Sequence, residues 1–104
     1  MAEFNIHELK TDPEPYNDID HGLRSCTIRV DDRGFKEGDY ILLRKTKYTG
    51  VQMASKMTGG DYPLVYTGSA LFCKITHIHS GVGMATGYVC VSFNIVDRYP
   101  GRVM

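Results

Sequence analysis

The sequence predicts an α+β fold that is mainly β: a small, partly open β-barrel with one or two short helices. Segments in which apolar and polar residues alternate recur along the chain, and this alternation is typical of half-buried strands. The 104 residues include 11 glycines and no long apolar repeat of helical period, so short strands joined by tight turns are favoured over a helical bundle. This length suits one domain, residues 1–104, with its core in residues 4–96.

The N-terminal segment predicts a strand followed by a helix. Phe4 and Ile6 lie two residues apart, which is compatible with a short first strand over residues 4–11. A helix then begins at Asp12-Pro13-Glu14, because an Asp cap, a proline in the first turn and an early acid all favour a helix N-terminus. Gly22 is expected to end this helix. Its buried positions are expected to be Tyr16, Ile19 and Leu23.

The chain is organised around the strand that follows, over residues 25–30. An apolar set and a polar set of residues alternate along it, and we expect the apolar set to form its buried face. The apolar set is Cys26, Ile28 and Val30, and the polar set is Ser25, Thr27 and Arg29.

Arginines recur around this strand and indicate a binding function. Arg24, Arg29 and Arg33 can present three guanidinium groups beside the hydroxyl group of Thr27. Such a group suits phosphate or carboxylate, because each guanidinium offers a planar fork of donors and keeps its charge. In the alternative interpretation, the arginines pair with Asp31, Asp32 and other carboxylates on a solvated sheet.

The remainder of the chain predicts three more strands and one long connection. The strands are expected at residues 40–44, 69–78 and 88–96, and Phe35 is expected to anchor the turn before the first of them. Their inward positions are Leu71, Cys73, Ile75, Val89, Val91, Phe93 and Ile95. Residues 46–66 have few apolar residues in period, which favours a long, flexible hairpin loop. Residues 97–104 are expected to form a frayed tail.

Charge and cysteine content narrow the classes of function. Twelve basic residues balance twelve acidic ones, so the overall basicity typical of nucleic-acid-binding proteins is absent and any such site must be a local patch. The cysteines at positions 26, 73 and 90 form no C-x-x-C pair, and their odd number argues against a disulfide framework. Since no apolar run of membrane-spanning length and no secretory signal is visible, we expect a reduced, cytoplasmic protein.

Histidines and cysteines give no firm indication of a metal or of a nucleophile. His77 and His79 share a strand face, but a metal site needs a further ligand from His7, His21 or a carboxylate, and no spacing indicates this convergence. Cys26 and Cys73 occupy strand positions with apolar neighbours, where a thiol usually behaves as a small core residue. We therefore predict no metal and no cofactor.

Tyrosines near the long loop offer faces on which bases could stack. They are Tyr40, Tyr48, Tyr62, Tyr66 and Tyr88. Packing within the core or between hairpin strands is the alternative role for these rings.

Five short motifs occur along the chain in a characteristic order. A His-Glu-Leu-Lys-Thr strand at residues 7–11 precedes the helix. An Asp-Arg-x-Phe-x-x-Gly-Asp turn occupies residues 32–39, and Tyr-Thr-Gly and Gly-Tyr-Val segments lie at residues 66–68 and 87–89. A motif of the form G-x-K-x-x-E-x-R is placed on Gly22, Arg24, Thr27 and Arg29.

This order resembles the ASCH domains of the PUA-like superfamily, in particular a small bacterial and phage branch catalogued as a domain of unknown function. The resemblance covers residues 6–96 and is most specific in the first forty residues. It implies a barrel of five or six strands, a cleft beside the motif strand, and RNA or a modified nucleoside as ligand. The chain departs from the pattern in two places. Arg24 and Thr27 replace the motif lysine and glutamate, and residues 51–63 resemble an insertion.

We expect a small binding module for RNA or a nucleotide-like ligand, encoded by a bacterium or its phage. The arginines would hold phosphate, with a further cation from the first strand and hydroxyl groups from the motif strand. The candidate ligand-binding residues are Lys10, Arg24, Ser25, Thr27, Arg29 and Arg33.

Two other classes of function remain open. Thr27 matches the hydroxyl position of ASCH members that hydrolyse acetylated cytidine, which makes it the candidate catalytic residue of an amidohydrolase. Arg24 stands where those relatives have the lysine that serves as base, and a guanidinium cannot accept a proton. His7 or Glu8 would have to replace it, so we expect no such activity. The third class is a protein-interaction module whose loop over residues 46–66 docks on a host protein.

Overall fold

The computed structural model describes residues 4–54 and 63–99 of the chain, and every structural statement below refers to these residues. The elements follow one another along the sequence as β1 (Ile6–Thr11), α1 (Pro13–Asp20), β2 (Cys26–Val30), β3 (Tyr40–Thr46), α2 (Gly50–Ala54), β4 (Tyr66–His79) and β5 (Tyr88–Tyr99). The strands form one sheet in the order β1-β3-β4-β5-β2. β1 pairs with β3 in parallel, and the other pairs are antiparallel.

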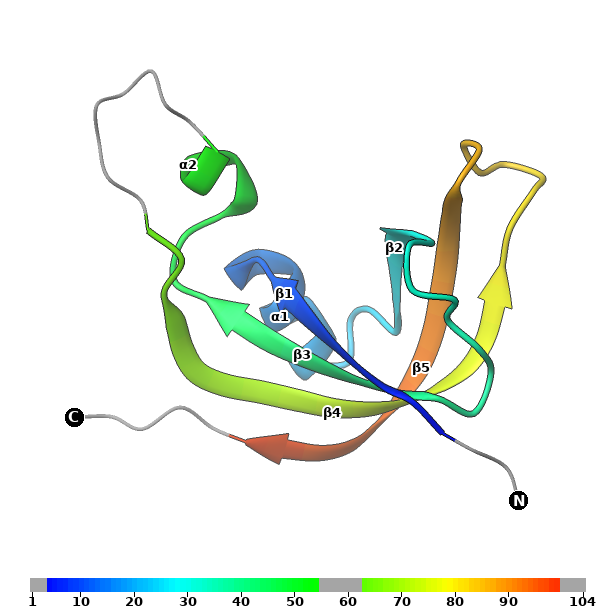
Figure 1. Cartoon of the computed structure of the whole chain (residues 1–104). Coiled ribbons are helices and arrows are strands. Elements are labelled where there is room, and N and C mark those ends of the chain that lie inside the picture. Colours follow the sequence, from blue (N-terminus) through cyan, green and yellow to red (C-terminus); the bar gives the residue numbers. More distant parts are fainter. Residues whose placement is uncertain (1–3, 55–62, 100–104) are drawn as a thin grey trace.

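The sheet curls into a half-barrel (Figure 1). β4 and β5 are the long strands of this curl, and their pairing shifts register between Phe72 and Cys73 and again between Ile75 and His77. Such bulges bend a strand and increase its twist. The half-barrel leaves β1 and β2 as the two edges of the sheet. The predicted α+β, mainly β and partly open barrel is confirmed.

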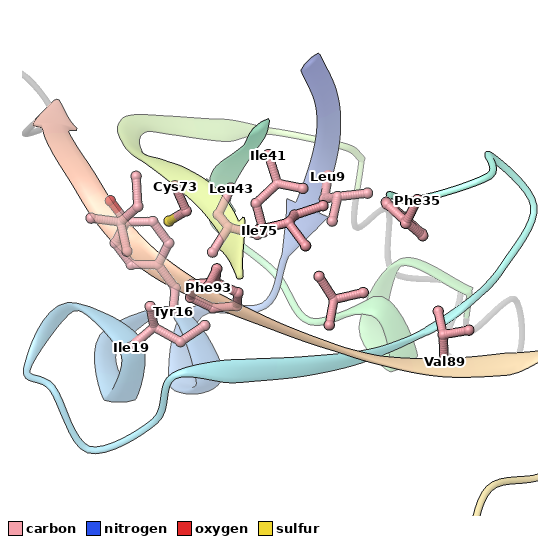
Figure 2. Packing of buried hydrophobic residues seen from close by; sticks show 12 residues of the cluster. Leu9, Tyr16, Ile19, Phe35, Ile41, Leu43, Cys73, Ile75, Val89 and Phe93 are labelled. Atoms are coloured by element: carbon pink, nitrogen blue, oxygen red, sulfur yellow. The ribbon is translucent and has the colours of Figure 1, made fainter. Parts of the chain in front are cut away.

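The hydrophobic core lies between the sheet and α1. Burial of the predicted inward residues is confirmed for Leu71, Cys73, Ile75, Val89, Val91 and Phe93, while Ile95 is partly buried against them. Figure 2 shows Tyr16 and Ile19 of α1 near Phe93 at one end of the cluster, with Phe35 and Val89 towards the other. The inner face of the sheet and α1 therefore form one closely packed core, and the motif strand β2 is joined to it through its pairing with β5.

α1 ends at a glycine, as the sequence predicts. Gly22 has φ of +75°, and the N–H groups of Gly22 and Leu23 donate to the carbonyls of Ile19 and Asp18 at 3.1 and 2.8 Å. This is a Schellman motif, whose left-handed position favours glycine. The prediction that Leu23 is buried is wrong, since it is 79% exposed. The residue against which it would pack in such a motif is the polar Asp18.

β2 turns its polar set inward, which reverses our prediction. Thr27 is buried and Arg29 is half-buried, whereas Ile28 is 54% exposed. The register with β5 explains this, because Thr27 lies opposite Val91 and Arg29 opposite Val89. Residues directly opposite each other in a sheet share a face, and both valines face the core. The arginine of the motif strand therefore lies on the inner face of the half-barrel.

The long connection and the C-terminal segment match the prediction in part. Residues 46–66 join β3 to β4 as expected, and α2 lies within them. Residues 55–62 of this loop lie outside the described residues, so its flexibility and its docking on a host protein stay predictions. The prediction of a frayed tail over residues 97–104 is wrong for residues 97–99. β5 continues to Tyr99, which pairs with Ala70 of β4. Residues 100–104 lie outside the described residues.

Candidate functional site

The two edge strands of the half-barrel are bridged by arginine side chains, and we call the gap between β1 and β2 the seam. The Tyr40 N–H of β3 donates to the carbonyl of Asn5, and backbone groups alternate in direction along a strand. The carbonyls of Glu8 and Lys10 therefore point to the free edge of β1. Arg33 Nη1 donates to the Glu8 carbonyl and Arg29 Nη2 to the Lys10 carbonyl, at 2.5 and 3.0 Å.

Arg29 is the central residue of the seam. Its Nε donates to Thr27 Oγ1 at 3.3 Å, and its Nη2 lies 3.5 Å from Thr11 Oγ1 in addition to the Lys10 carbonyl. Its remaining nitrogen, Nη1, has no hydrogen-bond partner among the described residues. The guanidinium is thus fixed by neutral oxygens on two strands while one of its edges stays available for a ligand.

Four of the predicted site residues line one hollow, which we call the cationic cavity. It has a volume of about 250 Å³ and lies at the seam beside Arg29. Its lining includes Lys10, Arg24, Thr27 and Arg29. The lysine comes from β1 and the other three from β2 or the turn before it, so the fold brings together residues that are far apart in sequence. This convergence follows from the curl of the sheet.

The two other predicted site residues lie elsewhere. Arg33 lines a neighbouring cavity on the other side of Arg29. Ser25 is exposed and lines no described cavity, although its backbone carbonyl accepts a hydrogen bond from Phe93 N–H at 3.1 Å. Arg33 therefore adds positive charge near the cationic cavity, whereas Ser25 is not placed to contact a ligand in it.

Asp12 is a site residue that sequence reasoning missed. The sequence predicts that it caps the helix, but its side chain makes no capping hydrogen bond to α1. Instead, Asp12 Oδ1 accepts a hydrogen bond from Gly50 N–H of α2 at 2.9 Å, and the residue lines the cationic cavity. A local helix-start pattern cannot reveal a partner 38 residues away. The carboxylate ties α2 to the seam and faces the charge of Arg29.

Carboxylates neutralise the arginines of the seam only in part. Arg33 forms an ion pair with Asp32 at 3.5 Å, as the alternative interpretation expects. Arg24 donates instead to the backbone carbonyl of Cys26, and Arg29 has no ion pair in the described part of the chain. Three cations and one carboxylate line the cationic cavity, so it carries a local positive excess in a protein of zero net charge.

Electrostatics at the seam supports this description. Burial lowers the pKa of Arg29 from its ordinary value, and the nearby charge of Arg33 lowers it further, while Asp12 acts in the opposite direction. An arginine nevertheless stays protonated at physiological pH. An anionic ligand would bind favourably beside a partly desolvated cation with like-charged neighbours, because the anion would offset the repulsion among them.

The bases suggested for an amidohydrolase are not beside Thr27. His7 is buried and donates through Nε2 to Asp39 Oδ2 at 3.0 Å. The Glu8 carboxylate pairs with Arg44 at 2.5 Å. Neither residue lines the cationic cavity, in which the titratable neighbours of Thr27 other than arginines are Lys10 and Asp12.

The histidines outside the core have hydrogen-bond or ion-pair partners of their own. His77 Nδ1 lies 3.3 Å from Glu37 Oε1, His79 Nε2 donates to the carbonyl of Val82, and His21 Nδ1 donates to the carbonyl of Asn17. Within residues 4–54 and 63–99, no group of three or more His, Cys, Asp or Glu side chains is arranged to hold a metal ion.

The three cysteines are free thiols. Cys73 is buried in the core as predicted, and burial raises its pKa to about 12. Cys26 was expected to be a core residue but is half-buried, on the outer face of β2 next to Cys90. None of these thiols lines the cationic cavity.

Most of the predicted stacking tyrosines have partners elsewhere in the fold. Tyr40 stacks on Phe72 with ring centroids 5.0 Å apart, Tyr66 lies under the guanidinium of Arg44, and the Tyr48 ring lies 5.5 Å from Lys47 Nζ. Tyr62 lies outside the described residues. Tyr88 differs, because it lies at the seam with its side chain 42% exposed.

Together, these features define a small half-barrel domain with a cationic cavity between its two edge strands. A family model described as Domain of unknown function (DUF3850) matches residues 6–93. The chain belongs to this family. No curated protein matches the sequence significantly. In the described part of the chain, no helix has the length and apolar character needed to cross a membrane.

Proposed function

We propose that the chain is a binding module for RNA or a nucleotide-like ligand, and that a phosphate group of the ligand occupies the cationic cavity. The convergence of Lys10, Arg24 and Arg29 on one cavity with a single carboxylate, Asp12, is the observation that supports this function. Phosphate needs several charged donors that approach it from different directions, and the two edge strands supply them.

Each residue of the cavity has a distinct role in this proposal. Arg29 offers Nη1, since its other nitrogens are held by Thr27, Thr11 and the Lys10 carbonyl. The ammonium group of Lys10 has no ion pair or hydrogen bond among the described residues and can turn toward the ligand. Arg24 and the hydroxyl group of Thr27 complete the set.

We also propose that this family belongs with the ASCH domains of the PUA-like superfamily and acts in the cytoplasm of a bacterium, encoded there or by a phage. The half-barrel and the position of the motif strand at the seam support this assignment. The Lys10-Thr11 pair and the Arg24 to Arg29 segment lie on opposite sides of the same opening.

Binding of a fluorescein-labelled single-stranded RNA, measured by anisotropy at several salt concentrations, tests the function. Arg29→Ala should weaken binding and reduce the slope of log affinity against log salt by about one. Lys10→Ala should weaken binding without destabilising the fold, because its side chain has no described partner. Equal affinity of the wild type and both variants would contradict the proposed site.

Asp12→Asn is the matched control for this experiment. The amide keeps the oxygen that accepts the Gly50 N–H bond, but it removes the negative charge that faces the cavity. Affinity for RNA should therefore rise, while a structural role of Asp12 alone would leave it unchanged or lower it. Opposite effects of Arg29→Ala and Asp12→Asn would distinguish an anion site from damage to the fold.

Hydrolysis of acetylated cytidine is the second candidate function. It is favoured by one observation, the presence of Lys10 in the same cavity as Thr27, because the neutral amine of a lysine can serve as a base. Chromatography of acetylated cytidine incubated with the protein tests it. The binding-module proposal predicts no free cytidine, whereas release that disappears in both Thr27→Ala and Lys10→Ala would assign the hydrolase class.

A further inference from the structure

A second cavity, which we call the Tyr88 cavity, lies on the other side of Arg29 from the cationic cavity. Its volume is about 330 Å³, which is within the range of small-molecule sites. Arg29 and Ile28 line both cavities, so a ligand that follows the seam would pass from one to the other. Nothing in the proposed phosphate contacts uses this second cavity.

The lining of the Tyr88 cavity includes both apolar and charged side chains. Leu9 and Phe35 are core residues that form part of its wall. Tyr88 is also in the lining, and among the described residues its ring makes no aromatic or cation–π contact. Asp32 and Arg33 are also in the lining, with a carboxylate and a guanidinium 3.5 Å apart. An exposed aromatic face beside a donor and an acceptor is suited to a flat heterocycle.

We infer that the Tyr88 cavity is the base subsite of this seam and takes a nucleobase with an exocyclic amino group. The inference rests on the proposed function, because the phosphate in the cationic cavity would position the base. The ring stacks on Tyr88, the Asp32 carboxylate accepts a hydrogen bond from the amino group, and Arg33 donates to a neighbouring ring nitrogen or carbonyl. Uracil fits less well, since both of its exocyclic groups are carbonyls that repel a carboxylate.

The charge arrangement of the seam favours this orientation over the reverse one. Lys10, Arg24 and Arg29 surround the cationic cavity, whereas the Tyr88 cavity pairs its one additional cation with a carboxylate. In the Tyr88 cavity, a phosphate would be repelled by the Asp32 carboxylate. The apolar side chains of this cavity would not stabilise it. A base in the cationic cavity would leave three cations with a single carboxylate, Asp12, to balance them.

Another cavity beside Arg29 is the competing location for the base. It has a volume of about 650 Å³ and is lined on its apolar side by Met53, Ala54, Pro63 and Leu64. It offers no aromatic ring in its described lining. Leu64→Ser, which changes this cavity and leaves the Tyr88 cavity intact, is therefore the matched control for Tyr88→Ala.

Short oligonucleotides test the inference by fluorescence anisotropy: oligocytidine, oligouridine, and an abasic strand of the same length and charge. The wild type should bind oligocytidine more tightly than oligouridine, and the abasic strand least. Tyr88→Ala should lower oligocytidine affinity at least about fivefold and leave abasic affinity unchanged. Tyr88→Phe, which keeps the stacking face, should bind as the wild type does. Asp32→Asn should narrow the difference between oligocytidine and oligouridine.

The outcomes separate this inference from the proposed function. If the abasic strand binds as tightly as oligocytidine, or if Tyr88→Ala retains wild-type affinity for oligocytidine, the base subsite is overturned and the phosphate site stands. If Leu64→Ser instead loses the base-dependent part of the affinity, the base lies beside α2 and the assignment to Tyr88 is wrong. If no strand binds to the wild type, both the subsite and the proposed function fail.

Discussion

At the scale of single residues, the pair of His7 and Asp39 shows how a polar group is retained in so small a core. Asp39 is 2% exposed, and its carboxylate accepts hydrogen bonds from His7 Nε2 at 3.0 Å and from the Asn5 N–H at 3.2 Å. Burial alone would raise the pKa of Asp39, but these hydrogen bonds and the interaction with His7 outweigh it, so the pKa is lowered. The pair joins the start of β1 to the start of β3.

This lowered pKa predicts a specific loss of stability in acid. A carboxyl group that releases its proton more readily in the folded state stabilises that state above its unfolded pKa of about 3.9. The stabilisation is lost as the pH falls below this value and through the folded pKa. The free energy of unfolding in urea should therefore decrease below about pH 4 in the wild type. Asp39→Asn should show a smaller decrease over the same interval.

A matched control variant distinguishes the effect of Asp39 from general acid denaturation. Asp32→Asn removes an exposed carboxylate that does not contact His7 or Asp39, so the stability of this variant should follow the wild-type pH dependence. At neutral pH, Asp39→Ala should cost about 1–3 kcal/mol, because it leaves the His7 and Asn5 donors without an acceptor. The same pH dependence in wild type and Asp39→Asn would contradict the assigned role.

At the scale of elements, α2 is attached to the site through a hydrogen bond to Asp12 that no local sequence pattern predicts. Gly50 N–H donates to Asp12 Oδ1 at 2.9 Å, and no residue of α2 is buried. A helix of this length has little stability of its own. Its position over the seam therefore depends on Asp12 to a large extent.

Asp12→Ala should consequently release α2 without melting α1. The side chain makes no capping hydrogen bond to α1, so the cost of about 1 kcal/mol that usually follows loss of an N-cap should not appear in α1. Backbone order parameters from nitrogen-15 relaxation should fall at residues 50–54 and stay unchanged at residues 13–20. Loss of order in α1 with α2 unaffected would show that Asp12 is a helix cap after all.

The sequence predicted the strands and the first helix correctly where a single local sequence pattern determined the structure. The alternation of Leu71, Cys73 and Ile75 matched a central strand with one buried face, and Gly22 ended α1 because a left-handed residue is needed there. β2 was assigned correctly as a strand, but its buried face was reversed. Its register with β5 decides which side chains face inward, and an alternating pattern does not contain that register.

The same distinction applies to the candidate site. Arg24, Thr27 and Arg29 are close in sequence, so a pattern in one strand could bring them together. Lys10 was included in the predicted site on motif order alone, and Asp12 was predicted to have only a local role. Which residues of a distant strand meet across the seam depends on the curl of the sheet, and this is set by bulges that no residue type marks.

At the scale of the whole molecule, the half-barrel has two free edges and closes them with side chains instead of a further strand. Exposed sheet edges are sites of unwanted pairing with other chains. Arg29 and Arg33 cover the free carbonyls of β1 at Lys10 and Glu8. The arginines thus protect an edge while they build a site, which couples the stability of the seam to its occupancy.

These two roles of the arginines should respond differently to salt. The bonds across the seam run from guanidinium groups to neutral oxygens, such as Arg29 to the Lys10 carbonyl, and salt screens such bonds less than interactions between ions. The chain has zero net charge, so there is little overall repulsion for salt to relieve. The free energy of unfolding should change by less than about 0.5 kcal/mol between 0.05 and 0.2 M KCl. RNA affinity should fall roughly twentyfold over the same range if three cations contact phosphates. Urea titrations and anisotropy in the same buffers measure both quantities.

A parallel fall in stability and affinity would mean that salt acts by opening the seam, whereas constant affinity would exclude phosphate from the cationic cavity.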